Sequence, residues 1–174
     1  MGVAGSGKTT IATALSQRLG WSMAEADEFH PQANIEKMSH GIALDDEDRW
    51  PWLQSIRDWM TGQAQAGHST VLTCSALKRS YRDLLATADG SVLFLHLTGD
   101  PALLAERMLG RSGHFMPPTL LPSQLAALEP LDDDELAAGS MELDISHTPE
   151  QLVEEILAAL KRRNGGGPLP PSAL

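Results

Sequence analysis

The chain has 174 residues, enough for one domain with a full hydrophobic core, and a formal net charge of −10 from 13 basic and 23 acidic residues. An acidic protein repels nucleic acid and anionic membranes, so neither is an expected partner. No apolar run reaches the roughly 18 residues of a membrane span, and the single Cys74 cannot form an internal disulfide, so we expect a soluble cytoplasmic protein.

The first ten residues carry the most recognisable motif. Residues 2–9 fit G-x-x-x-x-G-K-[ST], the pattern of a loop (P-loop) whose backbone N–H groups surround a phosphate chain. A helical pattern follows up to Leu19, so the helix dipole can face the anion; a chance match in a Gly/Ser-rich tail would not explain that helix. We expect Lys8 to act catalytically on the β- and γ-phosphates of ATP and Thr9 to bind Mg²⁺. The nucleotide-binding residues expected here are Gly2, Val3, Ala4, Gly5, Ser6, Gly7, Lys8, Thr9 and Thr10.

The motif begins at residue 2, which leaves no room for the buried strand that ordinarily precedes such a loop. Each large apolar residue of that strand stabilises a fold by roughly 1.5–3 kcal/mol, against a total of about 5–15 kcal/mol for a domain. We therefore expect the N-terminal central strand to be missing from the sequence as written, through a late start or a truncation.

Residues 21–27 predict a short strand that ends in two carboxylates. Alternate residues of a strand share a face, so Glu25 and Asp27 are expected to point together into the crevice at the carboxyl edge of the sheet. Asp27 is the candidate for orienting the acceptor hydroxyl and taking its proton, and Glu25 the candidate for holding a Mg²⁺-bound water. The alternative is a pair of solvent-facing turn carboxylates.

The middle of the chain continues the alternation of helix and strand. Helical patterns cover residues 32–39 and 45–66, and apolar strands are expected at residues 69–74, buried on both faces, and 91–97. A basic turn, residues 78–82, opens another helix. Asp100 and Pro101 then predict a helix start, and Arg107 and Arg111 share a face of that helix at the edge of a lid, expected at about residues 107–128. We expect both arginines to bind the nucleotide, and Arg111 to be catalytic.

The last third predicts a loop at residues 112–122, a short helix at 123–128, an acidic loop at 132–135 and an edge strand at 141–145. Thr148 and Gln151 form a capping box for a final helix, and residues 164–174 are expected to be a disordered tail. The whole pattern predicts an α/β fold: one domain, residues 1–163, with a parallel sheet between helices.

Several polar side chains are candidates for the acceptor substrate. Each alone is more often a surface charge or a structural histidine, but they follow predicted element ends in an acidic protein. The candidates, with Asp27, are His30, Arg49, Lys78, Arg79, Arg82 and His114.

Taken together, the residues resemble the gluconokinases, over nearly all of the chain up to about residue 162. The blocks that carry the resemblance are residues 2–9, Glu25-Ala26-Asp27, His30-Pro31, Asn34, Lys37-Met38, Gly41, Leu44-Asp45-Asp46, Asp48-Arg49, Pro51-Trp52-Leu53, residues 74–79, Tyr81-Arg82-Asp83, Arg107, Arg111, residues 113–115, Ser123-Gln124 and Leu128-Glu129-Pro130.

The resemblance implies a P-loop domain of the nucleoside-monophosphate-kinase type, with a five-stranded parallel sheet, a mobile lid and commonly a homodimer. It implies transfer of phosphate from ATP to D-gluconate, giving 6-phosphogluconate. Asp27, Arg49 and residues 78–82 would lie by the acceptor, and Arg107 and Arg111 by the nucleotide. Family members carry several residues before the loop, and this sequence does not. The alternatives are another small-molecule kinase, for example one acting on shikimate, and a nucleotide-binding protein without catalysis.

Overall fold

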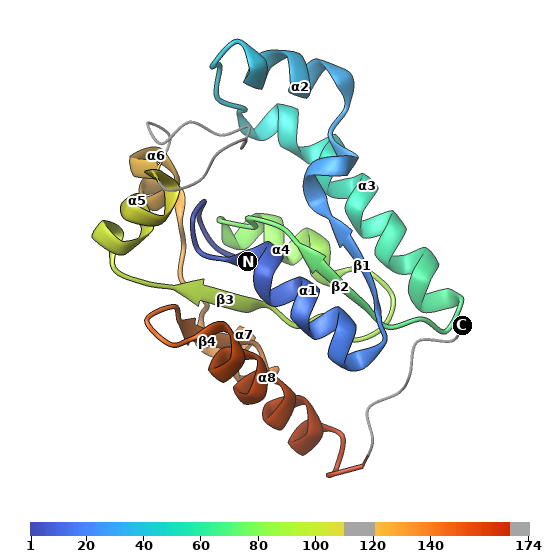
Figure 1. Ribbon diagram of the computed structural model, residues 1–174. Helices are drawn as coiled ribbons and strands as arrows, with labels where there is room; N and C mark the ends of the chain where they lie inside the picture. Colours follow the sequence, from blue (N-terminus) through green and yellow to red (C-terminus); the bar gives the residue numbers. More distant parts are fainter. Residues whose placement is uncertain (110–120, 168–174) are drawn as a thin grey trace.

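The computed structural model describes residues 1–109 and 121–167, in which helices and strands alternate (Figure 1). The elements of the first half are α1 (Lys8–Leu19), β1 (Ser22–Glu25), the 3-10 helix η1 (Ala26–Phe29), α2 (Gln32–Ser39), α3 (Asp46–Gln65), β2 (Thr70–Thr73) and α4 (Arg79–Ala86). Those of the second half are β3 (Leu95–Thr98), α5 (Pro101–Leu109), α6 (Leu121–Ala127), α7 (Asp133–Ala137), β4 (Met141–Asp144) and α8 (Pro149–Arg163). None of the helices in these described ranges has the length and apolar character needed to cross a bilayer.

The strands are parallel, as predicted, but they form two pairs rather than one continuous sheet. β1 pairs with β2, with Ser22 opposite Thr70, and β3 pairs with β4, with Leu95 opposite Met141. Within the described residues no strand joins β2 to β3. Only the start of the chain lies between them: the Leu97 N–H donates to the Met1 carbonyl at 3.0 Å and the Gly2 N–H donates to the Ser75 carbonyl at 3.1 Å. Met1 and Gly2 thus connect the two strand pairs at one end.

Two apolar clusters hold the helices to the strands. One joins α1 and α8 to β3 and β4, through residues such as Leu15, Leu97 and Ile156. The other joins α3 and α4 to the end of β2, through Leu53 and Leu85 among others. Successive side chains of a strand point to opposite faces, and on β2 Val71 packs against the first cluster while Leu72 packs against the second. Helices therefore cover both faces, as the alternating pattern predicts.

Four details differ from the sequence predictions. The first strand ends at Glu25, because the chain turns into η1 before Asp27. β2 is only partly buried and residues 91–94 are not a strand, since the position beside them holds no strand among the described residues. The acidic run at 132–135 opens a helix, α7, rather than a loop.

The helix caps explain where several elements begin. Asp132 and Glu135 form a reciprocal capping box that starts α7, with side-chain to backbone distances of 2.9 and 3.0 Å. The predicted capping box of Thr148 and Gln151 is present at the start of α8. The carboxylate of Asp100 accepts from the Ala102 N–H at 2.7 Å, and α5 begins at Pro101 as predicted.

Candidate active site

The P-loop adopts the geometry that its glycines allow. Gly7 has φ +91°, a left-handed conformation that costs glycine little, and it precedes α1 without any side-chain cap. A β-carbon on Gly7 would meet nothing within 4 Å, whereas one on Gly5 would lie 2.9 Å from the Leu104 carbonyl oxygen. The loop is therefore pressed against α5 on one side and open on the other, where the first N–H groups of α1 can face an anion.

One buried hydroxyl of the loop has no hydrogen-bond partner among the described residues. That hydroxyl belongs to Ser6. The Lys8 ammonium turns back on the loop and donates to the carbonyls of Gly2 and Val3, at 3.0 Å each. The Ala4 N–H donates to the side-chain oxygen of Gln124 on α6 at 2.7 Å. An orphaned hydroxyl beside an ammonium fits a site for a phosphate chain.

A cavity of about 330 Å³ lies beside the loop. Its lining includes Gly7, Thr10, Arg107 and His147. The Arg107 guanidinium donates to the Ile145 carbonyl at 2.9 Å, which fixes the end of α5 against the turn after β4. Arg107 thus lies beside the P-loop. Arg111, His114 and the middle of the predicted lid, residues 110–120, lie outside the described residues.

Asp27 and the P-loop approach the same strand end. Burial raises the pKa of the Cys74 thiol, just after β2, to about 11, and the charges of both Lys8 and Asp27 act on this group with opposite signs. The Gly2 N–H donates to the Ser75 carbonyl, two residues beyond β2, and Asp27 follows Glu25, which lies opposite Thr73 at the end of β2; the P-loop and Asp27 therefore both lie at the carboxyl end of β2. In Figure 1 the P-loop, in dark blue ahead of α1, lies beside the segment that follows β2. Parallel α/β sheets bind their ligands at this edge.

Glu25 and Asp27 do not share a strand face, because Asp27 belongs to η1. The carboxylate of Glu25 accepts a hydrogen bond from the Thr73 hydroxyl, so it lies between β1 and β2. Thr9 is exposed in the first turn of α1. The part of the chain that the structure describes holds no group of three or more His, Cys, Asp or Glu side chains arranged for a metal.

His30 is held beside Asp27 by an aromatic stack. Its ring lies on Trp52 with centroids 4.3 Å apart and planes 14° from parallel, and the Trp52 indole N–H donates to the Ala26 carbonyl at 2.7 Å. Burial lowers the pKa of His30; the Asp27 charge opposes that shift and Arg49 adds to it. A lowered pKa keeps the ring neutral at pH 7, so it can both donate and accept hydrogen bonds.

Two cations and one carboxylate surround the Tyr81 ring. The Arg49 guanidinium and the Lys78 ammonium lie 5.7 and 5.5 Å from the ring centroid, and Lys78 lies 2.7 Å from the Asp46 carboxylate. Hydrogen bonds from Lys78 and the Tyr81 hydroxyl lower the pKa of Asp46. Arg49 belongs to α3, as does Trp52, on which His30 stacks directly after η1, so α3 connects these side chains to η1. We call the whole set the acceptor cluster: Asp27, His30, Asp46, Arg49, Lys78 and Tyr81.

The structure gives Arg82, a predicted substrate residue, a structural position instead. Its side chain is 1% exposed and binds both carboxylate oxygens of Glu135, at 2.6 and 2.9 Å. Its remaining N–H groups donate to backbone carbonyls, including those of Glu129 and Pro130 at 3.0 Å. Because its N–H groups donate to Glu135 and to backbone carbonyls, Arg82 has no N–H group left to bind a ligand.

Arg79, also a predicted substrate residue, likewise forms ion pairs with carboxylates of the protein. Its guanidinium pairs with Asp83 at 2.6 Å and with Asp132. Arg79 and Arg82, with Asp132 and Glu135, form what we call the arginine network, which ties α4 to α7. Sequence reasoning counted both arginines as basic residues of a turn and had no measure of their burial.

Sequence reasoning also missed useful side chains. Asp46, Tyr81 and Gln124 received no role. A helix was predicted over residues 45–66, and the Asp45 and Asp48 capping box was the available signal that Asp46 lies in its first turn.

Comparison with known proteins identifies the family. A family model described as an AAA domain matches residues 1–131. The Gluconokinase of Gluconobacter oxydans (strain 621H) is 56% identical over 135 residues, which cover 78% of this chain and 76% of that protein. The chain belongs to the gluconokinase family. The Thermosensitive gluconokinase of Escherichia coli (strain K12) is 40% identical over 165 residues, or 94% of this chain and 88% of that protein.

Solved structures agree with the assignment to the gluconokinase family. A gluconokinase from Sinorhizobium meliloti 1021 superposes with a TM-score of 0.82 at 41% identity, covering 95% of this chain and 91% of that one. A sugar kinase from Janibacter sp. HTCC2649 superposes with a TM-score of 0.87 at 53% identity, covering 92% of this chain and 91% of that one. The shikimate kinase of Aquifex aeolicus, at 15% identity and a TM-score of 0.57, shares the fold alone. The predicted α/β P-loop kinase fold is thus confirmed.

Proposed function

We propose that this protein is a gluconokinase, which transfers the γ-phosphoryl group of ATP to D-gluconate and releases 6-phosphogluconate and ADP. Membership of the gluconokinase family supports the reaction. The structural observation that carries the proposal is that the P-loop and Asp27 both lie at the carboxyl end of β2, because phosphoryl transfer needs a phosphate site and an acceptor base on the two sides of one cleft.

The nucleotide half of the site is the P-loop and its surroundings. The backbone N–H groups of residues 2–10 bind the phosphates in this proposal, and Lys8 leaves its loop carbonyls to neutralise the charge that develops during transfer. Arg107 lies at the nucleotide cavity. Arg111 belongs to the proposed lid, residues 107–128, where it would stabilise the transferring group and help to exclude water.

Mg²⁺ is proposed as the metal, bound with the nucleotide. The Thr9 hydroxyl is exposed in the first turn of α1, and oxygen ligands are those that Mg²⁺ prefers. Glu25 is proposed to accept from a Mg²⁺-bound water. The ion supplies positive charge at the phosphates, and the protein residues position the reactants.

The acceptor half is the acceptor cluster. We assign Asp27 to orient the attacking hydroxyl and take its proton. D-gluconate is a carboxylate with a chain of hydroxyls, so Arg49 and Lys78 suit its carboxylate and neutral His30 suits its hydroxyls. His114 is retained as a proposed lid contact. Arg79 and Arg82 are left out, because the arginine network engages both.

A coupled assay of ADP release tests the reaction. With Mg·ATP, D-gluconate is expected to produce saturable ADP release and shikimate is expected to produce none. Release with shikimate but not gluconate would indicate a different small-molecule kinase. ATP binding by calorimetry with no release for either acid would indicate a nucleotide-binding protein without catalysis.

Three further proposals complete this description. Residues 1–163 form a single kinase domain, and the protein is a homodimer, as the family resemblance implies. Its location is cytoplasmic, which a single buried cysteine fits. Light scattering coupled to gel filtration measures the oligomeric state directly.

A further inference from the structure

Gln124 connects α6 to the P-loop, across 120 positions of the sequence. Its side-chain oxygen accepts a hydrogen bond from the Ala4 N–H at 2.7 Å, and this contact is partly buried. The residues assigned above to the phosphates, the metal and the acceptor do not include Gln124. Because the bond is made to the backbone of the loop, a role of Gln124 in the reaction must act through that backbone.

The peptide group that Gln124 binds also contacts the Lys8 ammonium. The Val3 carbonyl and the Ala4 N–H belong to one trans peptide group, so these two polar groups point in opposite directions. The Val3 carbonyl accepts from the Lys8 ammonium at 3.0 Å and from the Ser6 N–H at 3.4 Å. Gln124 therefore orients the peptide that receives Lys8 and that closes the first turn of the loop.

The contact between α5 and the loop is of a different kind. A β-carbon on Gly5 would lie 2.9 Å from the Leu104 carbonyl oxygen and 2.9 Å from a side-chain carbon of Met108, so α5 packs closely against Gly5. Packing of this kind limits how far the loop can move, but it does not set the direction of a peptide group. A hydrogen bond is directional, so the contact with Gln124 adds a constraint that α5 does not supply.

The segment that carries Gln124 is itself held at both ends. Leu121, at the start of α6, is buried in the apolar cluster of α1 and α8. Beyond α6, the Glu129 N–H donates to the Leu77 carbonyl at 2.8 Å, and the Glu129 carboxylate accepts from the Arg79 N–H. Gln124 lies between these two attachments, so its side chain projects from a fixed backbone. A side chain on a fixed element positions its partner more accurately than one on a free loop.

We propose that Gln124 is a positioning residue for phosphoryl transfer. Its side-chain oxygen holds the peptide between Val3 and Ala4, so that the N–H groups of the P-loop and Lys8 meet the phosphates in reactive alignment. This inference rests on the proposed kinase function, and Gln124 itself touches no reacting atom. A small misplacement of groups around a reacting centre lowers a rate by up to about a hundredfold, so loss of the bond should appear in kcat.

Two substitutions of Gln124 separate the hydrogen bond from packing. Gln124→Met keeps nearly the same side-chain length but removes the acceptor oxygen, so kcat at saturating Mg·ATP and D-gluconate should fall at least about tenfold. The KM for gluconate should stay within about twofold of wild type, since the lost bond is on the nucleotide side. Gln124→Glu keeps an acceptor oxygen in the same place, so its kcat should stay within about threefold of wild type.

Glu129→Ala is the matched control on the same segment. It also removes a side-chain acceptor of a backbone N–H, but that N–H belongs to Arg79 at the start of α4 rather than to the P-loop. Its kcat should stay within about twofold of wild type.

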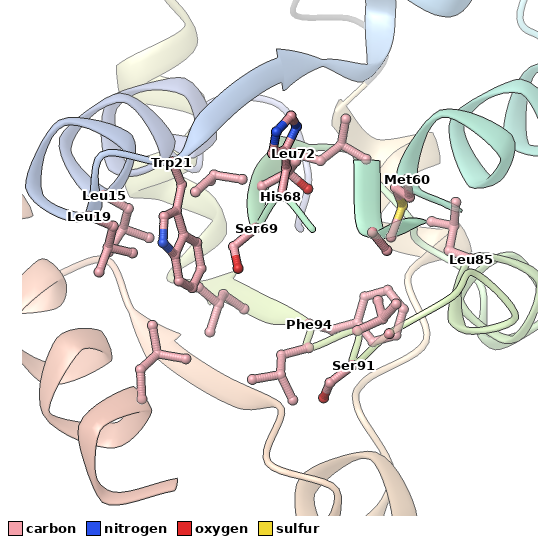
Figure 2. Close-up of a pocket in the computed structure, with 18 of the residues that line it drawn as sticks. Leu15, Leu19, Trp21, Met60, His68, Ser69, Leu72, Leu85, Ser91 and Phe94 are labelled. Atoms are coloured by element: carbon pink, nitrogen blue, oxygen red, sulfur yellow. The ribbon is translucent and has the colours of Figure 1, made fainter. Parts of the chain in front are cut away.

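Thermal stability excludes a general effect on folding. Gln124 does not line the apolar cavity of about 690 Å³ in Figure 2, whose walls include Leu15, Trp21 and Phe94. Gln124→Met therefore leaves the packing around this cavity unchanged, and its Tm should stay within a few degrees of wild type.

Hydrogen exchange measured by NMR reports the bond directly. The Ala4 amide should exchange at least about tenfold faster in Gln124→Met than in wild type or Gln124→Glu. Unchanged exchange at Ala4, wild-type kcat in Gln124→Met, equal losses of kcat in the two Gln124 variants, or an equal loss in Glu129→Ala would each overturn the proposal. Wild-type protein without gluconate-dependent ADP release would instead refute the proposed function, a result that no comparison of variants can imitate.

Discussion

The two ends of the basic turn at the start of α4 have opposite environments. Lys78 is 32% exposed and shares the half-exposed carboxylate of Asp46 with Tyr81, whereas Arg82 is 1% exposed and locked onto the buried carboxylate of Glu135. An exposed charge pair exchanges partners at little free-energy cost, but a buried pair that loses one partner leaves an uncompensated charge. Burial therefore decides which basic residues of this turn are available to bind a ligand and which stabilise the fold.

The acceptor cluster and the arginine network thus predict different consequences of mutation. Changes in the acceptor cluster should alter kinetics and leave Tm nearly constant. Loss of the buried Arg82–Glu135 pair of the arginine network should lower Tm and leave the kinetics of the folded protein nearly constant.

Asp27→Asn is expected to give the largest effect. Asparagine keeps the size of the side chain but cannot take the proton of the acceptor hydroxyl, so kcat should fall by about 10²- to 10⁴-fold. Turnover measured by ADP release, with ATP affinity by calorimetry and Tm as controls, checks this. Near wild-type turnover would remove Asp27 from its proposed role.

Arg82→Ala should lower the free energy of unfolding by about 3–5 kcal/mol, because it leaves the Glu135 carboxylate buried without its partner. Tm should fall by about 10 °C or more in thermal melts. Arg79→Ala is the matched control: its side chain is 37% exposed, so the loss should be no more than about 1 kcal/mol. A large rise in the gluconate KM of folded Arg82→Ala, with Tm unchanged, would contradict the division between the two regions.

Lys78→Ala should raise the KM for gluconate about tenfold, equivalent to about 1.4 kcal/mol, through loss of a charge that binds the carboxylate. Its Tm should stay within a few degrees of wild type, since the Asp46 pair is exposed. Arg18→Ala, which removes a surface pair with Glu154, is the kinetic control and should leave KM unchanged. An identical KM for both variants would argue against carboxylate binding at Lys78.

The smallest effect should be a pH dependence that comes from His30. Its folded pKa lies below the ordinary value, so the unfolded chain binds more protons as pH falls below about 6.5. The sign is therefore a loss of stability on acidification, with the contribution fully present above that pH. Denaturant melts of wild type and His30→Gln from pH 5 to 8 measure it, and a steeper acid loss in the variant would be inconsistent with a lowered pKa.

The sequence predicted those features that depend on local pattern. The P-loop with α1, the start of α5 at Pro101 and the capping box of Thr148 each follow from residues close together in the chain. The helix of Asp132 was missed because its acidic run was judged by charge, although the Asp132 and Glu135 spacing was visible.

Features that depend on long-range contacts were not predictable in the same way. The burial of Arg82 is set by Glu135, 53 positions away, and the stacking of His30 by Trp52 on another helix. The shift of Asp27 from strand to η1 depends on where β1 loses its pairing with β2 after Glu25. No local pattern encodes these arrangements.

A crystal structure with a non-hydrolysable ATP analogue, Mg²⁺ and D-gluconate tests the central claim most directly. The phosphates should lie in the P-loop, with the gluconate hydroxyl that accepts the phosphoryl group within about 3 Å of an Asp27 carboxylate oxygen. The gluconate carboxylate should lie by Arg49 and Lys78. Gluconate bound away from Asp27, or P-loop glycines turned away from the phosphates, would contradict the proposed site.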